Sequence, residues 1–153
     1  MIEINKPLPL SNLGLLKLDE LAIKSIPDGG FLAYLDFEDV HFLDHEKTKQ
    51  GIEKLAAEQI PNPLSFSGWV GFFGYEFLGA HLGLNLSANR DLDIPDGWFA
   101  RPRTIIHILI GVTKIESCLP GRAQEIADSL SFSSRINLDT INFPTKFQRC
   151  NLE

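Results

Sequence analysis

The chain has 153 residues, of which 44% are hydrophobic and 22% are charged, and its formal net charge is -6. These values are typical of one soluble globular domain with a core of its own. No cluster of Lys and Arg is large enough to follow a phosphate backbone, so we expect neither a nucleic-acid nor an anionic-membrane partner. Because no apolar run could span a bilayer and residues 1–6 lack a signal-peptide pattern, we expect a cytoplasmic protein.

Prolines and leucines dominate the first part of the chain. We expect residues 7–12 to be extended, since proline lacks an N–H group and disfavours helix at the residue before it. The leucines that follow indicate either a short helix capped near Ser11 or an irregular apolar segment. Residues 21–26 predict a strand that ends at the Pro-Asp-Gly-Gly turn of residues 27–30.

Two more strands are expected, over residues 31–35 and 38–43, so that two hairpins form an antiparallel meander. The first is nearly all apolar, which predicts burial on both faces. The second alternates, with Val40 and Phe42 on one face and polar groups on the other.

The clearest helix is predicted over residues 44–60. Asp44 can cap its free N–H groups, and Pro61 ends it. Its predicted apolar stripe consists of Ile52, Leu55, Ala56 and Ile60.

Residues 65–79 combine six aromatic side chains with glycines at 68, 71, 74 and 79. Glycine weakens strands and helices, whereas aromatic residues favour strands. We interpret the stretch as a short buried strand that ends in a sharp turn and leads into a helical segment near residues 75–82. Glycine there permits a close approach of another backbone or of a ligand.

The second half of the chain predicts a loop over residues 83–97, a central strand over 104–110 and a returning strand over 114–119. Residues 98–100 resume extended structure before the central strand. A final helix is expected over residues 122–130, with Ala123, Ile126, Ala127 and Leu130 on one face.

Together these elements predict a single α+β domain over residues 1–153, mainly antiparallel sheet with two or three helices packed on it. We interpret residues 131–153, which are polar and aperiodic, as a tail or a segment that leads elsewhere.

Neither a metal site nor a catalytic set is predicted. The acids and histidines between residues 36 and 46 fit the wet face of a strand and a helix N-terminus, and no ligand spacing is met. His107, inside an apolar strand, is interpreted as structural and Asp96 as a turn former. No G-x-S-x-G elbow or phosphate loop is present, and Cys118 and Cys150 are interpreted as reduced thiols.

Two segments, residues 66–76 (FSGWVGFFGYE) and 90–99 (RDLDIPDGWF), resemble the N-terminal region of the chorismate-utilising enzymes. These are component I of anthranilate synthase and of aminodeoxychorismate (para-aminobenzoate) synthase. Residues 21–25 are similar to the family's leucine-rich strand that ends in serine. The resemblance covers nearly the whole chain and is strongest over residues 64–99.

The resemblance implies a non-catalytic N-terminal domain that is inactive alone, with no cofactor of its own. The catalytic C-terminal domain of the family carries the chorismate site and the Mg²⁺-binding glutamates, and that region is absent from this sequence. The implied partners are this catalytic domain and the glutamine amidotransferase, component II, which supplies ammonia. The full-length enzyme would belong to folate or tryptophan biosynthesis.

An amino-acid pocket is also implied by the family, with Ser25, Phe31, Gly71 and Tyr75 as its candidate residues. The chain has Gly30 where the family carries an arginine before the aromatic residue, which favours aminodeoxychorismate over anthranilate as the product. The alternative is a stand-alone amino-acid-binding or protein-interaction module without catalytic activity.

Overall fold

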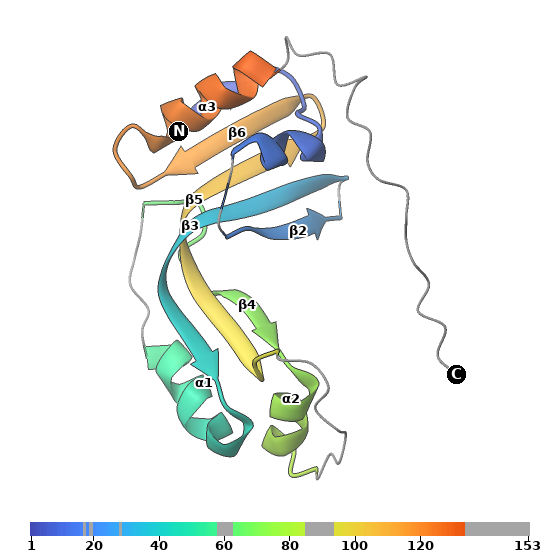
Figure 1. The fold of residues 1–153 in the computed structure, drawn as a ribbon, viewed down its shortest axis with the longest axis vertical. Coiled ribbons are helices and arrows are strands. Elements are labelled where there is room, and N and C mark those ends of the chain that lie inside the picture. Colours follow the sequence, from blue (N-terminus) through green and yellow to red (C-terminus); the bar gives the residue numbers. More distant parts are fainter. Residues whose placement is uncertain (17, 19, 28, 58–62, 85–93, 134–153) are drawn as a thin grey trace, which may run out of the picture.

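The computed structural model describes residues 1–133 except 17, 19, 28, 58–62 and 85–93 (Figure 1). In this part of the chain, six strands form one antiparallel sheet in the order β1-β6-β5-β3-β2, and β4 pairs with β5 beside that path. The predicted α+β class is confirmed. The elements are β1 (Ile2–Ile4), η1 (Leu10–Leu16), β2 (Ala22–Ile26), β3 (Gly30–Leu43), η2 (His45–Lys47), α1 (Thr48–Ala57), β4 (Val70–Phe73), α2 (Tyr75–His81), β5 (Gly97–Leu109), β6 (Val112–Ser117) and α3 (Arg122–Ser133), where η marks a 3-10 helix.

The prediction of separate strands over residues 31–35 and 38–43 is wrong, because β3 is continuous and one hairpin, not two, connects it to β2. Asp36 and Asp39 adopt φ values of 53° and 51°. Short polar side chains tolerate this left-handed region better than other residues do. A register shift between Glu38 and His41 marks a bulge. The acidic run therefore bends the strand instead of ending it.

The predicted central strand also extends further than expected. β5 pairs with β3 along its whole length, with β6 from Thr104 onward and with β4 up to Ala100. Pro102 falls between these two partners, where one edge of β5 has no strand against it in the described part of the chain. A proline interrupts a sheet least at such a place, because fewer ladder hydrogen bonds depend on its N–H group.

The main core lies in the half of the sheet that carries β1, β6 and β2. Here α3 and η1 cover one face (Figure 1). The apolar face predicted for the last helix is confirmed, since Ile126 and Leu130 are 1% and 0% exposed. Strand β1 is not among the predicted elements; its three residues pair with β6 and form one edge of the sheet.

The other half of the sheet consists of the lower parts of β3 and β5 together with β4, and α1 and α2 flank it (Figure 1). Asp44 caps the start of η2 as predicted, because its Oδ1 accepts a hydrogen bond from the Glu46 N–H at 2.8 Å. The predicted helix begins with η2 and continues as α1, whose residues include no buried side chain. Ile60 and the predicted end of this helix lie outside the described residues.

The glycine-rich stretch forms β4, turns at Gly74 and continues as α2, in the predicted order. A Cβ atom at Gly71 would overlap the Trp98 carbonyl oxygen, and one at Gly74 would lie 2.5 Å from the Asp96 carbonyl oxygen. Gly71 and Gly74 therefore allow the backbone of β4 and of the turn after it to lie directly against the backbone of residues 96–98. The predicted burial of the strand is wrong, because Phe72 and Phe73 are 43% and 41% exposed.

We predict that Gly71→Ala lowers the free energy of unfolding by roughly 2–3 kcal/mol, because the methyl group forces β4 away from β5. Denaturant unfolding followed by circular dichroism measures the loss. Gly14→Ala is the matched control, since nothing lies within 4 Å of a Cβ atom at that position. Equal stabilities of the two variants would contradict the close-approach explanation.

Candidate functional site

An open groove of about 900 Å³ lies between β2 and β4. Its walls are mainly aromatic and aliphatic, and one lysine and one serine line its β2 side. The lining residues are Leu21, Ala22, Ile23, Lys24, Ser25, Tyr34, Phe66, Trp69, Val70, Gly71, Phe72 and Trp98. Concave apolar sites with few polar groups are the usual form of small-molecule sites.

The structure brings together two of the four residues predicted from the family pocket. Ser25 and Gly71 both line the groove. Phe31 lies opposite Ser25 in the β2–β3 pair and is 36% exposed, but it is not among the lining residues. Tyr75 is 71% exposed at the start of α2 and does not line the groove either.

Ring contacts brace the walls of the groove. Phe37 meets Trp98 edge to face with centroids 5.2 Å apart, and Tyr34 meets Phe66 at 5.7 Å. Burial raises the pKa of the Tyr34 hydroxyl, so this group stays protonated at neutral pH. Aromatic contacts of this kind hold side chains in fixed positions beyond what area burial alone achieves.

Trp69 is held from three sides. Its Nε1–H donates to the Leu55 carbonyl oxygen at 2.9 Å, and its ring lies 5.0 Å from the His41 ring. The Arg101 guanidinium stacks 4.5 Å from the ring centroid and forms an ion pair with Asp39 at 3.3 Å. Arg101 is only 3% exposed, so this cation–π contact is largely shielded from solvent. Arg101 thus connects Asp39, at the bend of β3, to Trp69 in the wall of the groove.

A serine, a histidine and a glutamate meet on the sheet near the segment that precedes β4. Ser65 Oγ lies 3.3 Å from His107 Nε2, and the same Nε2 lies 2.8 Å from Glu116 Oε1. A catalytic triad needs the acid on one ring nitrogen and the nucleophile on the other. Because both contacts use Nε2, we interpret the arrangement as a structural clamp, in which His107 has the polar partners that a structural histidine needs.

The Ser65 backbone N–H completes this clamp by donating to Glu116 Oε2 at 2.8 Å. Burial raises the pKa of the Glu116 carboxyl, but hydrogen bonds from Ser65 and the charge of His107 more than offset that effect. The pKa therefore lies below its ordinary value.

Asp44, His45 and Asp96 bring three ligand-type atoms within 4.8 Å of one another. Asp96 Oδ2 accepts from the His45 backbone N–H at 2.9 Å and lies 2.6 Å from His45 Nδ1. His45 and Asp96 therefore bond to each other and fasten η2 to the start of β5, while Asp44 Oδ1 accepts from the Glu46 N–H. Asp96 lies at a bend directly before β5, in keeping with its interpretation as a turn former, and it is 6% exposed. No sequence signal links residues 51 positions apart.

Comparisons of the chain with protein-family models, curated proteins and solved structures found no match. The family is accordingly a proposal, and it rests on the motifs of residues 66–76 and 90–99. Among the described helices, none has the length and apolar character needed to cross a membrane.

We predict that Glu116→Gln lowers the free energy of unfolding at pH 7 by about 1–2 kcal/mol, since the charged acceptor of two bonds is lost. A carboxyl whose pKa is lowered by folding stabilises the fold above its unfolded pKa, near 4.3, and this contribution disappears as pH falls through the folded pKa. The difference between wild type and variant should therefore shrink below about pH 4.

Urea unfolding at pH 7 and pH 3 measures this difference. Glu125→Gln is the control, because Glu125 is a largely exposed carboxylate in a surface pair with Arg122 and its loss should cost less than about 0.5 kcal/mol. A Glu116→Gln penalty of equal size at both pH values would contradict the charged clamp.

Proposed function

We propose that this chain is the non-catalytic N-terminal domain of component I of aminodeoxychorismate synthase or anthranilate synthase. The proposal begins with the two motifs of residues 66–76 and 90–99. The contact between their described parts supports it, since β4 pairs with the start of β5 and Gly74 N–H donates to the Asp96 carbonyl at 2.6 Å. Two segments that are separate in sequence thus form one structural unit.

The observation that carries the proposal is an open row of aromatic rings. Phe42, Trp98 and Phe72 lie opposite one another on β3, β5 and β4. Phe42 is 69% exposed and Phe72 is 43% exposed, and Trp98 is half-buried. Large apolar rings gathered on a surface mark a site of association. We infer that the catalytic region of the enzyme docks on this aromatic row.

The opposite face of the same strands is already covered. Side chains alternate along a strand, so Leu43 and Phe73 point away from the aromatic row. Leu43 is 7% exposed, and Phe73 stacks on Phe77 of α2 with centroids 5.3 Å apart. Because α1 and α2 occupy that face, the aromatic row is the side of this half-sheet that remains available to a partner.

In this proposal the chemistry belongs to the catalytic region, which would hold chorismate and Mg²⁺ and receive ammonia from the amidotransferase in the cytoplasm. This chain contributes a docking surface. The shared use of His107 Nε2 by Ser65 and Glu116 supports a non-catalytic role, because it leaves the serine without an activating base.

The backbone at Gly30 favours aminodeoxychorismate as the product of the whole enzyme. A Cβ atom at Gly30 would lie 2.5 Å from the Ile108 carbonyl oxygen, so the position where the family carries an arginine is closed to a side chain. An α-carboxylate is held best by such an arginine fork. Among the described residues that line the groove, Lys24 is the one with a cationic side chain.

The groove favours a second candidate function, binding of an aromatic amino acid. Its rings would receive the side chain, and Lys24 and Ser25 could meet the carboxylate. This candidate does not need a catalytic region. It corresponds to a stand-alone binding module.

We predict that the chain binds a separately produced catalytic region of component I, and that Phe42→Ser and Phe72→Ser each weaken binding about tenfold. Aromatic residues at the centre of an interface commonly contribute this much. Isothermal titration calorimetry measures the affinity. With chorismate, ammonia and Mg²⁺, the chain alone should give no product.

Ile110→Ser is the matched control, because Ile110 is 80% exposed in the turn between β5 and β6, at the other end of β5. Its binding should equal that of the wild type. Turnover by the chain alone, or equal binding by all three variants, would contradict the proposal. Binding of free L-tryptophan without affinity for the catalytic region would support the second candidate instead.

A further inference from the structure

We propose that the wedge between α1 and the end of β3 binds a small dicarboxylate, with one carboxylate at Lys47 and the other at Lys54. The wedge has a volume of about 270 Å³. It is separate from the groove between β2 and β4, with which it shares no lining residue. The residues that line it are His41, Phe42, Leu43, Asp44, Lys47, Gln50, Gly51, Lys54 and Leu55.

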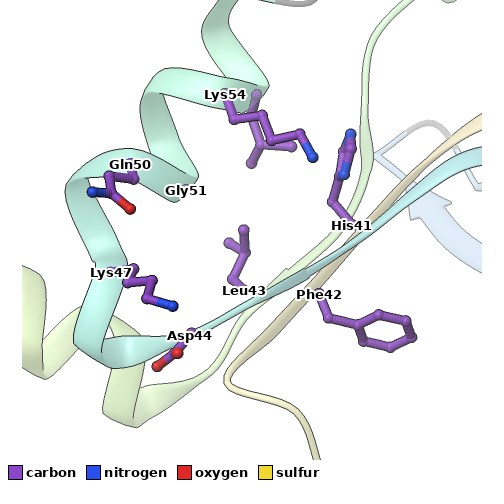
Figure 2. Close-up of a pocket in the computed structure, with 9 residues that line it drawn as sticks. His41, Phe42, Leu43, Asp44, Lys47, Gln50, Gly51 and Lys54 are labelled. Carbon is purple, nitrogen blue, oxygen red and sulfur yellow. The ribbon is translucent and has the colours of Figure 1, made fainter.

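The two lysines lie on one side of the helical segment. They are seven residues apart in sequence, which corresponds to about two helical turns and a rise of roughly 10 Å. Figure 2 shows the Lys54 ammonium directed toward His41 and the Lys47 ammonium directed toward the end of the wedge near Asp44, with Leu43 between them. The wedge therefore has two separate cationic ends.

Neither ammonium group is neutralised by an ion pair within the described part of the chain. Lys49, on the same helix, does have such a partner, since its Nζ lies 3.9 Å from Glu53 Oε1. Among the described residues, Asp44 is the one carboxylate that lines the wedge, and its Oδ1 accepts a hydrogen bond from the Glu46 N–H. Lys47 and Lys54 thus give the wedge a net positive character in a chain of net charge -6.

Between the two cations the wall is apolar. Leu43 is 7% exposed, and Gly51 leaves its side of α1 without a side chain. A short hydrocarbon linker fits over this wall. A single-centre anion such as phosphate would meet one lysine well and the other poorly. The volume is below the range of drug-sized ligand sites, about 300–1,000 Å³, which limits the ligand to a small molecule.

This inference does not depend on the proposed function. The wedge and the aromatic row share one residue, Phe42, and its ring points away from the wedge, whereas the two lysines belong to the helix-covered side (Figure 2). The experiment on the dicarboxylate site and the experiment on the docking surface can therefore give a negative result independently. The wedge needs only the intact chain for its test.

The test is a titration of the chain with glutarate, acetate and inorganic phosphate, followed by backbone amide NMR. Glutarate should bind about tenfold more tightly than acetate and should shift amides between residues 41 and 55. Lys47→Gln and Lys54→Gln should each weaken glutarate binding about fivefold, as expected for loss of one exposed ion pair. Lys49→Gln is the matched control and should bind as the wild type does.

Lys54→Arg keeps the charge and should retain affinity, which separates a lost ion pair from a disturbed fold. The proposal is overturned if glutarate binds no more tightly than acetate or if its shifts lie outside the wedge. It is also overturned if Lys49→Gln weakens binding as much as Lys54→Gln. Tighter binding of phosphate than of glutarate would exclude the two-centre site.

Discussion

The pairing of β3 with β5 through a bend is the constraint on which the other elements depend. Asp36, in the left-handed region, accepts two bonds from Arg122 at 3.1 Å each and one from the Thr104 hydroxyl at 2.6 Å. A paired guanidinium–carboxylate contact of this kind is geometrically specific. This contact attaches the start of α3 to the bend of β3. β3 and β5 therefore stay paired through the bend, although different helices cover the sheet on either side of it.

The two halves of the sheet differ in which faces are covered, and the proposed function depends on this difference. In the half with α3, both sides of β5 are buried, and Ile105 and Ile106 are 1% and 0% exposed. In the other half, α1 and α2 protect one face and leave the aromatic row open. The glycines of β4 allow its backbone to approach β5, which places Phe72 beside Trp98. Two of the three rings in the aromatic row, Phe72 and Trp98, therefore lie in the segments that carry the family resemblance.

Local patterns predicted local structure well. The apolar periodicity of residues 122–130, the cap at Asp44 and the β-branched run of 104–110 all led to elements that the structure contains. The contacts that decide the site join distant residues, such as Asp96 to His45 and Glu116 to Ser65, each 51 positions apart. Periodicity carries no information about such pairs. The bend was misread because acidic residues usually end strands, whereas here they adopt positive φ.

The proposed docking surface for a catalytic region is the aromatic row on β3, β5 and β4. Hydrogen–deuterium exchange of the chain, alone and with that catalytic region, tests it most directly. We expect added protection confined to amides near Phe42, in residues 70–73 and in residues 97–100, with no change in α3. Protection over α3 and η1 instead, or no protection anywhere, would contradict it.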